Sequence, residues 1–469
     1  MTNSTIAAIA TPAGSGGIGI IKISGPDALL IAASVFQKQD ESGNEENSQS
    51  SVFNSPESHR FYYGHIADTE NNRVLDEVLL AVMIAPRSYT REDVVEIHAH
   101  SGPVVLKSVL ELVLRKGAKL AEPGEFTKRA YINGRIDLTQ AEAVIDIINA
   151  KTDRALEIAT SQVRGNMKMQ IESIRDSLLR ILTEAEAAID FPDDIEETVN
   201  TDMLTDILQK QVADKLISLI SQYENAHFIR DGLKVVIAGR PNVGKSSLMN
   251  CLLQKDRAIV TPVPGTTRDL IEESFNIQGI NVIISDTAGL HETDDIVETI
   301  GIKKTHDCIK DSDLVLFTVD MSQSLTGEDY KIYETVHHRE LILVTNKQDI
   351  VIKGFKFDVP ESWGQIRAVE TSAINNKGID ALKNLIAEVC LDKCFESESA
   401  IIPNLRHKNA LEQSLQSALA AVEGIRAGIP FELISIDIRE SMDLLGEIIG
   451  ITVREDVLDQ IFSRFCIGK

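Results

Sequence analysis

The chain has 469 residues, enough for about three domains, and its hydrophobic content of 43% is ordinary for a globular protein. Its 47 basic and 71 acidic residues give a formal charge of −24, which repels nucleic acid at long range, so RNA contact requires a local basic patch or a partner protein. No N-terminal apolar signal segment and no apolar stretch of about 18 residues is visible, so we expect a cytoplasmic protein that does not span a membrane.

The first 120 residues predict a small α+β domain. Short apolar runs alternate with Pro, Gly and Asn, as is typical of strands separated by turns. Residues 40–58 are polar and predict a loop. The predicted strands are residues 5–10, 18–23, 61–66, 74–84 and 94–98, and a helix is predicted over residues 104–116.

From residue 139 to about 190, apolar residues recur at three-to-four spacing with no proline before Pro192, which predicts a long amphipathic helix. A second helix is predicted over residues 203–230, and helical periodicity returns from residue 405. Between residues 233 and 391 strands and helices alternate. We therefore predict a multidomain α/β and α protein. Its domains are an N-terminal α+β domain (1–120), a long-helix domain (121–231 and 392–469) and an inserted Ras-like P-loop domain (232–391).

Residues 239–246 read Gly-Arg-Pro-Asn-Val-Gly-Lys-Ser and lie between a short apolar strand and a predicted helix. This is the GxxxxGK[ST] pattern in its required strand–loop–helix context, so a chance match is improbable. Its glycines let backbone N–H groups surround phosphates, and the helix N-terminus adds positive potential. We expect Lys245 to neutralise the β- and γ-phosphates and Ser246 to bind Mg²⁺.

Four further segments predict a guanine nucleotide. Asp286 begins the motif Asp-Thr-Ala-Gly, whose Gly289 N–H can reach a γ-phosphate, and Thr266 and Thr267 occupy the place of a switch threonine. Residues 346–349 read Asn-Lys-Gln-Asp. The Asp349 carboxylate only accepts hydrogen bonds, and guanine offers paired N–H donors that adenine lacks. The Ser-Ala pair at residues 372–373 is expected to cap the guanine edge.

The position that holds a water-orienting glutamine in Ras-type GTPases is Leu290, which cannot hydrogen-bond water. The acidic stretch at residues 292–298 supplies alternatives, although it also fits a solvated loop. Spacing does not favour Arg257 or Arg268 as an arginine finger. Asn242 offers a neutral oxygen inside the phosphate loop, so a monovalent cation bound there could do the electrostatic work of an arginine finger.

Two further motif matches are rejected. Residues 14–19 form a GxGxxG pattern, but the residues that follow predict a strand, whereas a dinucleotide-binding loop must open a helix. Residues 466–469 resemble a CaaX box, but the last residue is Lys, Gly precedes it, and no polybasic run lies upstream.

Over nearly its whole length the chain resembles the MnmE/TrmE family of tRNA-modifying GTPases. Outside the nucleotide motifs the resemblance rests on residues 10–20 (ATPAGSGGIGI), 92–98 (EDVVEIH), 123–130 (PGEFTKRA), 137–143 (DLTQAEA) and 465–469 (FCIGK). It implies a homodimer formed through a tetrahydrofolate-binding N-terminal domain, and G domains that pair in a K⁺-dependent way that stimulates hydrolysis. It also implies a heterotetramer with an FAD-dependent MnmG/GidA-like subunit. That complex adds an aminomethyl or carboxymethylaminomethyl group to C5 of the wobble uridine (position 34) of certain tRNAs.

The resemblance also implies roles for individual residues. Glu298 matches the glutamate that positions the catalytic water, and Cys466 matches a terminal cysteine to which we assign no role. Lys22 and Arg135 stand where many relatives have Arg and Lys, which keeps the charge and changes the donor geometry. The K⁺ ligands would be Asn242, Thr261, Val263 and Thr266, the Mg²⁺ ligands Ser246 and Thr267, and the 5-formyltetrahydrofolate contacts Lys22, Glu96, Arg135 and Lys469. The GTP contacts would be Asn242, Val243, Gly244, Lys245, Ser246, Ser247, Thr261, Pro262, Val263, Pro264, Gly265, Thr266, Thr267, Asp286, Thr287, Ala288, Gly289, Asn346, Lys347, Asp349, Ser372 and Ala373.

Two rival functions fit a G domain of this kind. A ribosome-assembly GTPase is disfavoured because the sequence shows no KH-like GxxG module and no second G domain. A regulatory switch or scaffold that hydrolyses GTP slowly is disfavoured by the predicted K⁺ loop.

Overall fold

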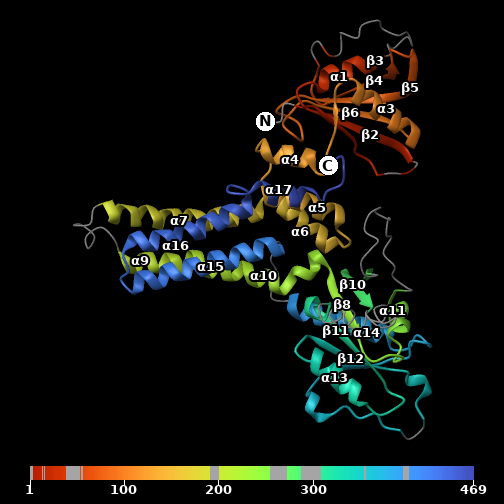
Figure 1. Ribbon diagram of the computed structural model, residues 1–469, viewed down its shortest axis with the longest axis vertical. Helices are drawn as coiled ribbons and strands as arrows, with labels where there is room; N and C mark the ends of the chain where they lie inside the picture. The colour runs from red at the N-terminus through yellow and green to blue at the C-terminus, as the bar shows by residue number, and fades with distance from the viewer. Residues whose placement is uncertain are drawn as a thin grey trace, which may run out of the picture. The chain divides into compact units, whose positions relative to one another are not determined.

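The computed structural model describes residues 4–12, 14, 16–38, 53, 56–190, 200–253, 272–286, 308–352, 355–394 and 401–469. The chain forms two compact units, whose helices and strands are labelled in Figure 1. The first contains Met1–Ile145, Val163–Leu179 and Met442–Lys469, and the second contains Asp146–Gln162 and Arg180–Ser441. Residues of the predicted long-helix domain therefore belong to both units. Among the helices of the described residues, none is long and apolar enough to cross a membrane.

The first unit contains a seven-stranded sheet in the order β3-β4-β5-β6-β2-β1-β7. Its strand pairs are antiparallel except β1 with β7. The helices α1 (Ala28–Val35) and α3 (Pro103–Arg115) pack against one face through a core that includes Ile21, Leu80 and Ile97. The strands are β1 (Ile6–Ile9), β2 (Gly16–Ser24), β3 (Phe36–Lys38), β4 (Arg60–Asp68), β5 (Arg73–Met83), β6 (Val94–Ser101) and β7 (Lys119–Leu120). The five predicted strands and the predicted helix are confirmed.

The residues that follow the GxGxxG pattern form a strand, as predicted. Residues from Gly16 to Gly19 lie in β2, and the chain continues as strand to Ser24. A Cβ atom at Gly19 would lie 2.6 Å from Leu106 Cδ1 of α3. This glycine is therefore required by helix-on-sheet packing rather than by a bound phosphate.

The prediction of one long helix over residues 139–190 is wrong, because three helices occupy this stretch. They are α5 (Leu138–Asn149), α6 (Asp153–Val163) and α7 (Asn166–Asp190). The Thr152 hydroxyl accepts a hydrogen bond from the Ala155 N–H (3.1 Å), which caps the start of α6. Gly165, with φ of 87°, separates α6 from α7. Apolar spacing continues across both breaks and therefore does not reveal them.

The second unit contains two of the predicted helical stretches. Residues 201–231 are helical throughout, as α9 (Thr201–Ile207), a π-helix (Leu208–Ala213) and α10 (Asp214–Asp231). The C-terminal helices are α15 (Leu405–Arg426), α16 (Phe431–Ile449) and α17 (Glu455–Phe462), which confirms the predicted periodicity. Residues of α16 from Met442 onward, and all of α17, belong to the first unit. Gly232 ends α10 with φ of 88°, and a Cβ atom there would lie 2.7 Å from Asn281 Nδ2.

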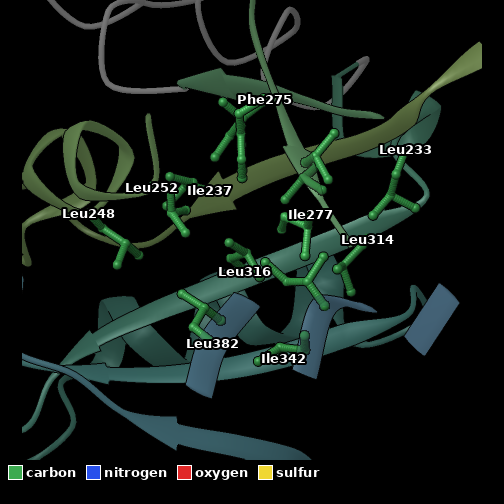
Figure 2. Close-up of a cluster of buried hydrophobic side chains, with 14 of the residues drawn as sticks. Leu233, Ile237, Leu248, Leu252, Phe275, Ile277, Leu314, Leu316, Ile342 and Leu382 are labelled. Carbon is green, nitrogen blue, oxygen red and sulfur yellow. The ribbon is translucent and has the colours of Figure 1, made fainter. Parts of the chain in front are cut away.

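The second unit also contains a six-stranded sheet in the order β13-β12-β11-β8-β10-β9, which is parallel except for the β9–β10 hairpin. Apolar side chains of its strands and of α11 and α14 form the core shown in Figure 2. The strands are β8 (Leu233–Ala238), β9 (Glu272–Ile277), β10 (Ile280–Asp286), β11 (Leu314–Asp320), β12 (Leu341–Asn346) and β13 (Arg367–Glu370), and the helices α11 (Lys245–Leu253), α13 (Gly327–Val336) and α14 (Ile379–Cys394). The alternation of strands and helices is as predicted. Loops after parallel strands emerge at one edge of the sheet, where ligands bind in such folds.

Candidate nucleotide-binding site

A cavity of about 490 Å³ opens among the loops that follow β8, β12 and β13. Pro241 and Ile374 line it together with nine residues predicted to contact GTP. These nine are Asn242, Gly244, Lys245, Ser246, Ser247, Asn346, Lys347, Asp349 and Ala373. Three loops that are far apart in the sequence thus meet around one space.

The phosphate loop, residues 239–246, approaches its neighbours too closely for side chains at two points. Gly239 has φ of 155°, and a Cβ atom there would collide with the Thr318 carbonyl oxygen. Gly244 has φ of 98°, and a Cβ atom there would collide with Asn346 Nδ2. Asn242 also has a positive φ, of 63°, which asparagine adopts more readily than most residues. The loop therefore depends on these residue types for its shape.

Lys245 begins α11 and is only 6% exposed. Its Nζ donates hydrogen bonds to the carbonyl oxygens of Gly239 (2.8 Å) and Arg240 (3.0 Å). The ammonium group is thus held inside the loop, at the N-terminus of a helix whose dipole adds positive potential. An anion in the cavity would meet both sources of positive charge.

Asn346 connects two of the loops that line the cavity, namely the phosphate loop and the loop after β13. Its Nδ2 donates to the Val243 carbonyl (2.9 Å) in the phosphate loop. Its Oδ1 accepts hydrogen bonds from the Thr371 hydroxyl (3.2 Å) and from the Ala373 N–H (3.1 Å). One buried amide therefore fixes the phosphate loop against the loop after β13.

The loop after β13 also holds the Asp349 carboxylate. Its Oδ1 accepts a hydrogen bond of 2.5 Å from the Ser372 hydroxyl, which also accepts from the Asn375 N–H (3.3 Å). Cys251 of α11 donates through Sγ to the Ala373 carbonyl (2.9 Å) and so links the loop after β13 to α11. Burial raises the pKa of the Cys251 thiol, which keeps it protonated as a donor.

Lys347 has φ of 70°, and its Nζ donates to Asp320 Oδ2 at 2.7 Å. Asp320 ends β11 and pairs in register with Asn346 of β12. Burial raises the pKa of the Asp320 carboxyl, but hydrogen bonds from Lys347 and Ser322 outweigh it and hold the pKa below its ordinary value. Asp320, Thr371 and Cys251 were not among the predicted residues. The available signal for Asp320 was an acidic residue at the end of an otherwise apolar strand.

Part of the predicted site lies outside the described residues and stays a prediction. This part comprises Thr261, Pro262, Val263, Pro264, Gly265, Thr266, Thr267, Thr287, Ala288, Gly289 and Glu298, as well as Leu290. Asp286 ends β10 and pairs in register with Ile237 of β8. Of the four predicted K⁺ ligands, Asn242 lies within the described residues. Of the two predicted Mg²⁺ ligands, Ser246 does.

The first unit brings together the residues predicted to bind folate. Lys22 of β2 and Glu96 of β6 are register partners, and Lys22 Nζ lies 3.4 Å from Glu96 Oε1. The other Glu96 oxygen lies 3.4 Å from His98 Nε2. Lys22 Nζ also lies 5.6 Å from the ring centroids of Tyr89 and Phe126, within cation–π range.

Arg135 reaches the same cluster, because its guanidinium lies 4.8 Å from the Tyr89 ring centroid. Burial raises the pKa of the Tyr89 phenol, whose oxygen lies 3.0 Å from the Thr127 hydroxyl. The Phe126 N–H donates to a main-chain oxygen of Lys469 (3.1 Å), so the C-terminal residues lie beside this cluster. Cys466 is exposed, and its carbonyl accepts from the Gly124 N–H at 3.4 Å. Tyr89, Phe126 and His98 were not predicted.

Comparison with known proteins adds independent information. Among solved structures, the G domain of the T. maritima FeoB iron transporter is 26% identical and covers 33% of this chain and 97% of that chain, with a TM-score of 0.25, too low to inform the fold. Two family models match the sequence: "GTP-binding protein TrmE N-terminus" over residues 5–135 and "MnmE helical domain" over residues 138–466.

Full-length relatives named "tRNA modification GTPase MnmE" agree with these models. The protein of Carboxydothermus hydrogenoformans is 44% identical and that of Syntrophus aciditrophicus 46% identical, each over 100% of both chains. The protein of Bacillus licheniformis is 44% identical over 99% of this chain and 100% of its own length. The resemblance predicted from the motifs is thus confirmed, and the chain belongs to the MnmE/TrmE family of tRNA modification GTPases.

Proposed function

We propose that this chain is a K⁺-stimulated GTPase that acts with an FAD-dependent MnmG/GidA-like subunit on the wobble uridine of certain tRNAs. Family membership makes it a GTP hydrolase of tRNA modification. The product would carry an aminomethyl or carboxymethylaminomethyl group at C5 of uridine 34. The cavity that joins Lys245 at one end to Asp349 at the other carries the nucleotide part of this proposal.

The residues around this cavity suit GTP with Mg²⁺. Lys245 can exchange the loop carbonyls for β- and γ-phosphate oxygens, and Ser246 at the same helix start offers a hydroxyl to Mg²⁺. Gly244 lets the phosphate loop approach Asn346 more closely than any side chain would allow. At the other end, Asp349 accepts the paired N–H donors of guanine, with Ser372 fixing its orientation. Mg²⁺, when bound, would neutralise charge on the phosphate oxygens.

Asn242 supports the K⁺ part of the proposal. Its left-handed backbone places it in the cavity wall within the phosphate loop. An amide oxygen is a neutral ligand of the kind that suits K⁺, and a cation there would act on transition-state charge as an arginine finger does. We propose that Thr261, Val263 and Thr266 complete this site and that Glu298 positions the attacking water.

The cluster in the first unit supports a tetrahydrofolate, with 5-formyltetrahydrofolate as the form to test. Lys22 and Arg135 offer positive charge for glutamyl carboxylates, and Glu96 offers an acceptor for pterin N–H groups. The Tyr89 ring between the two cations offers an aromatic face. We propose that Lys469, whose main chain lies beside Phe126, completes the site.

Exposed apolar side chains on the face of the seven-stranded sheet opposite α1 and α3 support a homodimer. Tyr62 packs into the core, so its neighbours Phe61 and Tyr63 point to the opposite face, where they are 57% and 47% exposed. Leu79 and Ile18 are also exposed. Exposed apolar side chains of this size mark interaction sites. The charge of −24 supports assigning bulk tRNA binding mainly to the FAD-dependent partner of the proposed heterotetramer.

Two experiments test the proposal, one for the tRNA assignment and one for the K⁺ mechanism. Wobble-uridine analysis of a strain that lacks this protein should show loss of the C5 modification, and unchanged tRNA would reject the tRNA assignment. The rate of GTP hydrolysis measured in KCl should exceed that in NaCl. Equal rates in the two salts would reject the cation mechanism and leave the family assignment intact.

A further inference from the structure

The strongest unassigned feature beside the cavity is Asp320, a carboxylate that is only 6% exposed and has no place in the predicted nucleotide motifs. Its Oδ2 accepts hydrogen bonds from Lys347 Nζ (2.7 Å) and Gln323 Nε2 (3.0 Å). Its Oδ1 accepts from the Ser322 N–H (3.0 Å) and hydroxyl (2.6 Å). A carboxylate held by four donors cannot turn away from its lysine without leaving buried charge unpaired.

Lys347 is the residue through which Asp320 can affect a ligand. Lys347 lines the cavity between Asn346 and Asp349, and its left-handed φ of 70° sets the direction of its side chain. Because the ammonium group is bound to Asp320, the part of Lys347 left to face the cavity is its methylene stem. A methylene stem is apolar and suits the flat face of a purine base rather than a phosphate.

The backbone keeps this arrangement in place. Asp320 and Asn346 are register partners at the ends of the parallel strands β11 and β12, and the Met321 N–H donates to the Asn346 carbonyl (3.0 Å). The distance between the carboxylate and the lysine is thus set by sheet geometry rather than by a mobile surface loop. Ordering the lysine before binding removes the side-chain entropy that the ligand would otherwise have to offset.

We propose that Asp320 is a positioning residue for the guanine nucleotide: it holds the Lys347 ammonium outside the cavity so that the lysine stem forms a preformed wall for the base. This inference rests on the proposed assignment of the cavity to a guanine nucleotide. It assigns Asp320 to nucleotide retention and not to the hydrolytic step.

The test is the dissociation rate of a fluorescent GDP analogue from full-length variants. Asp320→Ala should raise the dissociation rate about tenfold, equal to ~1.4 kcal/mol of binding free energy. Asp320→Asn, which keeps the volume and one acceptor oxygen, should raise it about threefold, a value between those of the wild type and the alanine variant. Turnover at saturating GTP should stay within about twofold for both, because Asp320 is assigned no role in the hydrolytic step.

Two further variants separate positioning from a merely structural role. Ser322→Ala removes a donor to the other carboxylate oxygen, leaves the lysine contact in place, and should stay within about twofold of the wild type. Lys347→Met keeps a stem without an ammonium group. In that background Asp320→Ala should add less than about twofold, since residues that act through one contact are not additive.

A base-specific readout completes the test. Asp320 is proposed to act through the stacking wall and not through Asp349, so the affinity ratio of GDP to IDP should be the same in Asp320→Ala as in the wild type. Additive effects of the two substitutions, a changed GDP-to-IDP ratio, or turnover that falls with affinity would overturn the Asp320 proposal. A wild-type protein that binds ADP as well as GDP would instead reject the nucleotide assignment on which it rests.

Discussion

The imidazole Nε2 of His227 lies 3.0 Å from Asp313 Oδ1. The other ring nitrogen, Nδ1, lies 3.0 Å from the Tyr223 carbonyl oxygen, so both nitrogens face acceptors. A neutral imidazole carries only one N–H, and both contacts are hydrogen bonds only in the protonated form. Asp313 Oδ2 also accepts from the Lys234 N–H (2.9 Å). When the imidazole is protonated, this pair therefore ties α10 to Asp313, which directly precedes β11, and through Asp313 to Lys234 of β8.

The first prediction concerns the pH dependence of this tie. Burial lowers the pKa of His227, but the hydrogen bond and charge of Asp313 and the Tyr223 carbonyl outweigh it, so the net pKa is raised. A raised folded-state pKa contributes stability that is fully present below the unfolded value of about 6.5 and is lost as pH rises through the folded value. We expect His227→Gln to lower the thermal unfolding midpoint more at about pH 6 than at about pH 8.

The exposed His337 provides the control, because its Nδ1 contacts the Glu334 carbonyl of its own helix turn and its ring lies beside the rings of Tyr333 and His338, which are close to it in sequence. His337→Gln should shift the midpoint by the same small amount at both pH values. A His227→Gln deficit that is equal at both pH values would show that the imidazolium form is not what stabilises the fold.

The second prediction concerns Glu298, which lies outside the described residues. If it positions the attacking water, Glu298→Ala should lower single-turnover hydrolysis by roughly a hundredfold or more and leave the affinity for a non-hydrolysable GTP analogue nearly unchanged. Glu292→Ala, in the same acidic stretch, should hydrolyse GTP at close to the wild-type rate. Normal turnover in Glu298→Ala would remove its assigned role.

The third prediction concerns the short hydrogen bond between Ser372 and Asp349. Ser372→Ala leaves the carboxylate without the donor that orients it, so we expect the dissociation constant for GDP to rise roughly fivefold, or ~1 kcal/mol. Ser324→Ala, an exposed serine of the same unit, should bind GDP normally. Equal affinities of Ser372→Ala and the wild type would mean that Asp349 keeps its orientation without this hydroxyl.

The fourth prediction separates two glycines of β2. A methyl group at Gly19 meets Leu106 at 2.6 Å, so Gly19→Ala should destabilise the first unit by about 1–3 kcal/mol through overpacking. A methyl group at Gly17 meets nothing within 4 Å, so Gly17→Ala is the matched control and should change stability little. Chemical denaturation curves of the two variants compare them directly, and similar midpoints would contradict the packing explanation.

The fifth prediction concerns the folate cluster. Lys22→Met removes the charge that lies 3.4 Å from Glu96 and over two rings, so calorimetry with 5-formyltetrahydrofolate should show affinity lowered by about tenfold or more. Lys107→Met, an exposed lysine of α3, should bind like the wild type. Absence of binding heat in the wild-type protein would remove the assignment altogether.

The features predicted correctly are those that local chemistry specifies. The phosphate loop needs glycines at Gly239 and Gly244, since backbone and side-chain atoms of Thr318 and Asn346 occupy the space of a side chain. Short apolar runs separated by Pro, Gly and Asn identified the strands of the first unit, and the strand that continues beyond Gly19 excluded a dinucleotide-binding loop.

The features that were missed depend on atoms brought together only by folding. Asp320 and Lys347 are 27 positions apart, and sheet register alone makes them partners. Tyr89 joins the folate cluster through a loop whose conformation no periodicity encodes. The breaks around α6 were missed for a different reason. Their signals, a capping Thr152 and a left-handed Gly165, are local, but the apolar period continues through both.

The two carbonyl contacts of Lys245 have a consequence for ligand size. The Lys245 ammonium group already binds the carbonyl oxygens of Gly239 and Arg240. A phosphate that replaces them therefore gains only the difference in binding free energy between its own oxygens and these peptide oxygens. A single phosphate therefore gains little from displacing those carbonyls, whereas adjoining phosphates offer several charged oxygens to the same ammonium group. We therefore expect the loop to bind nucleoside diphosphates and triphosphates more tightly than monophosphates, whatever base they carry.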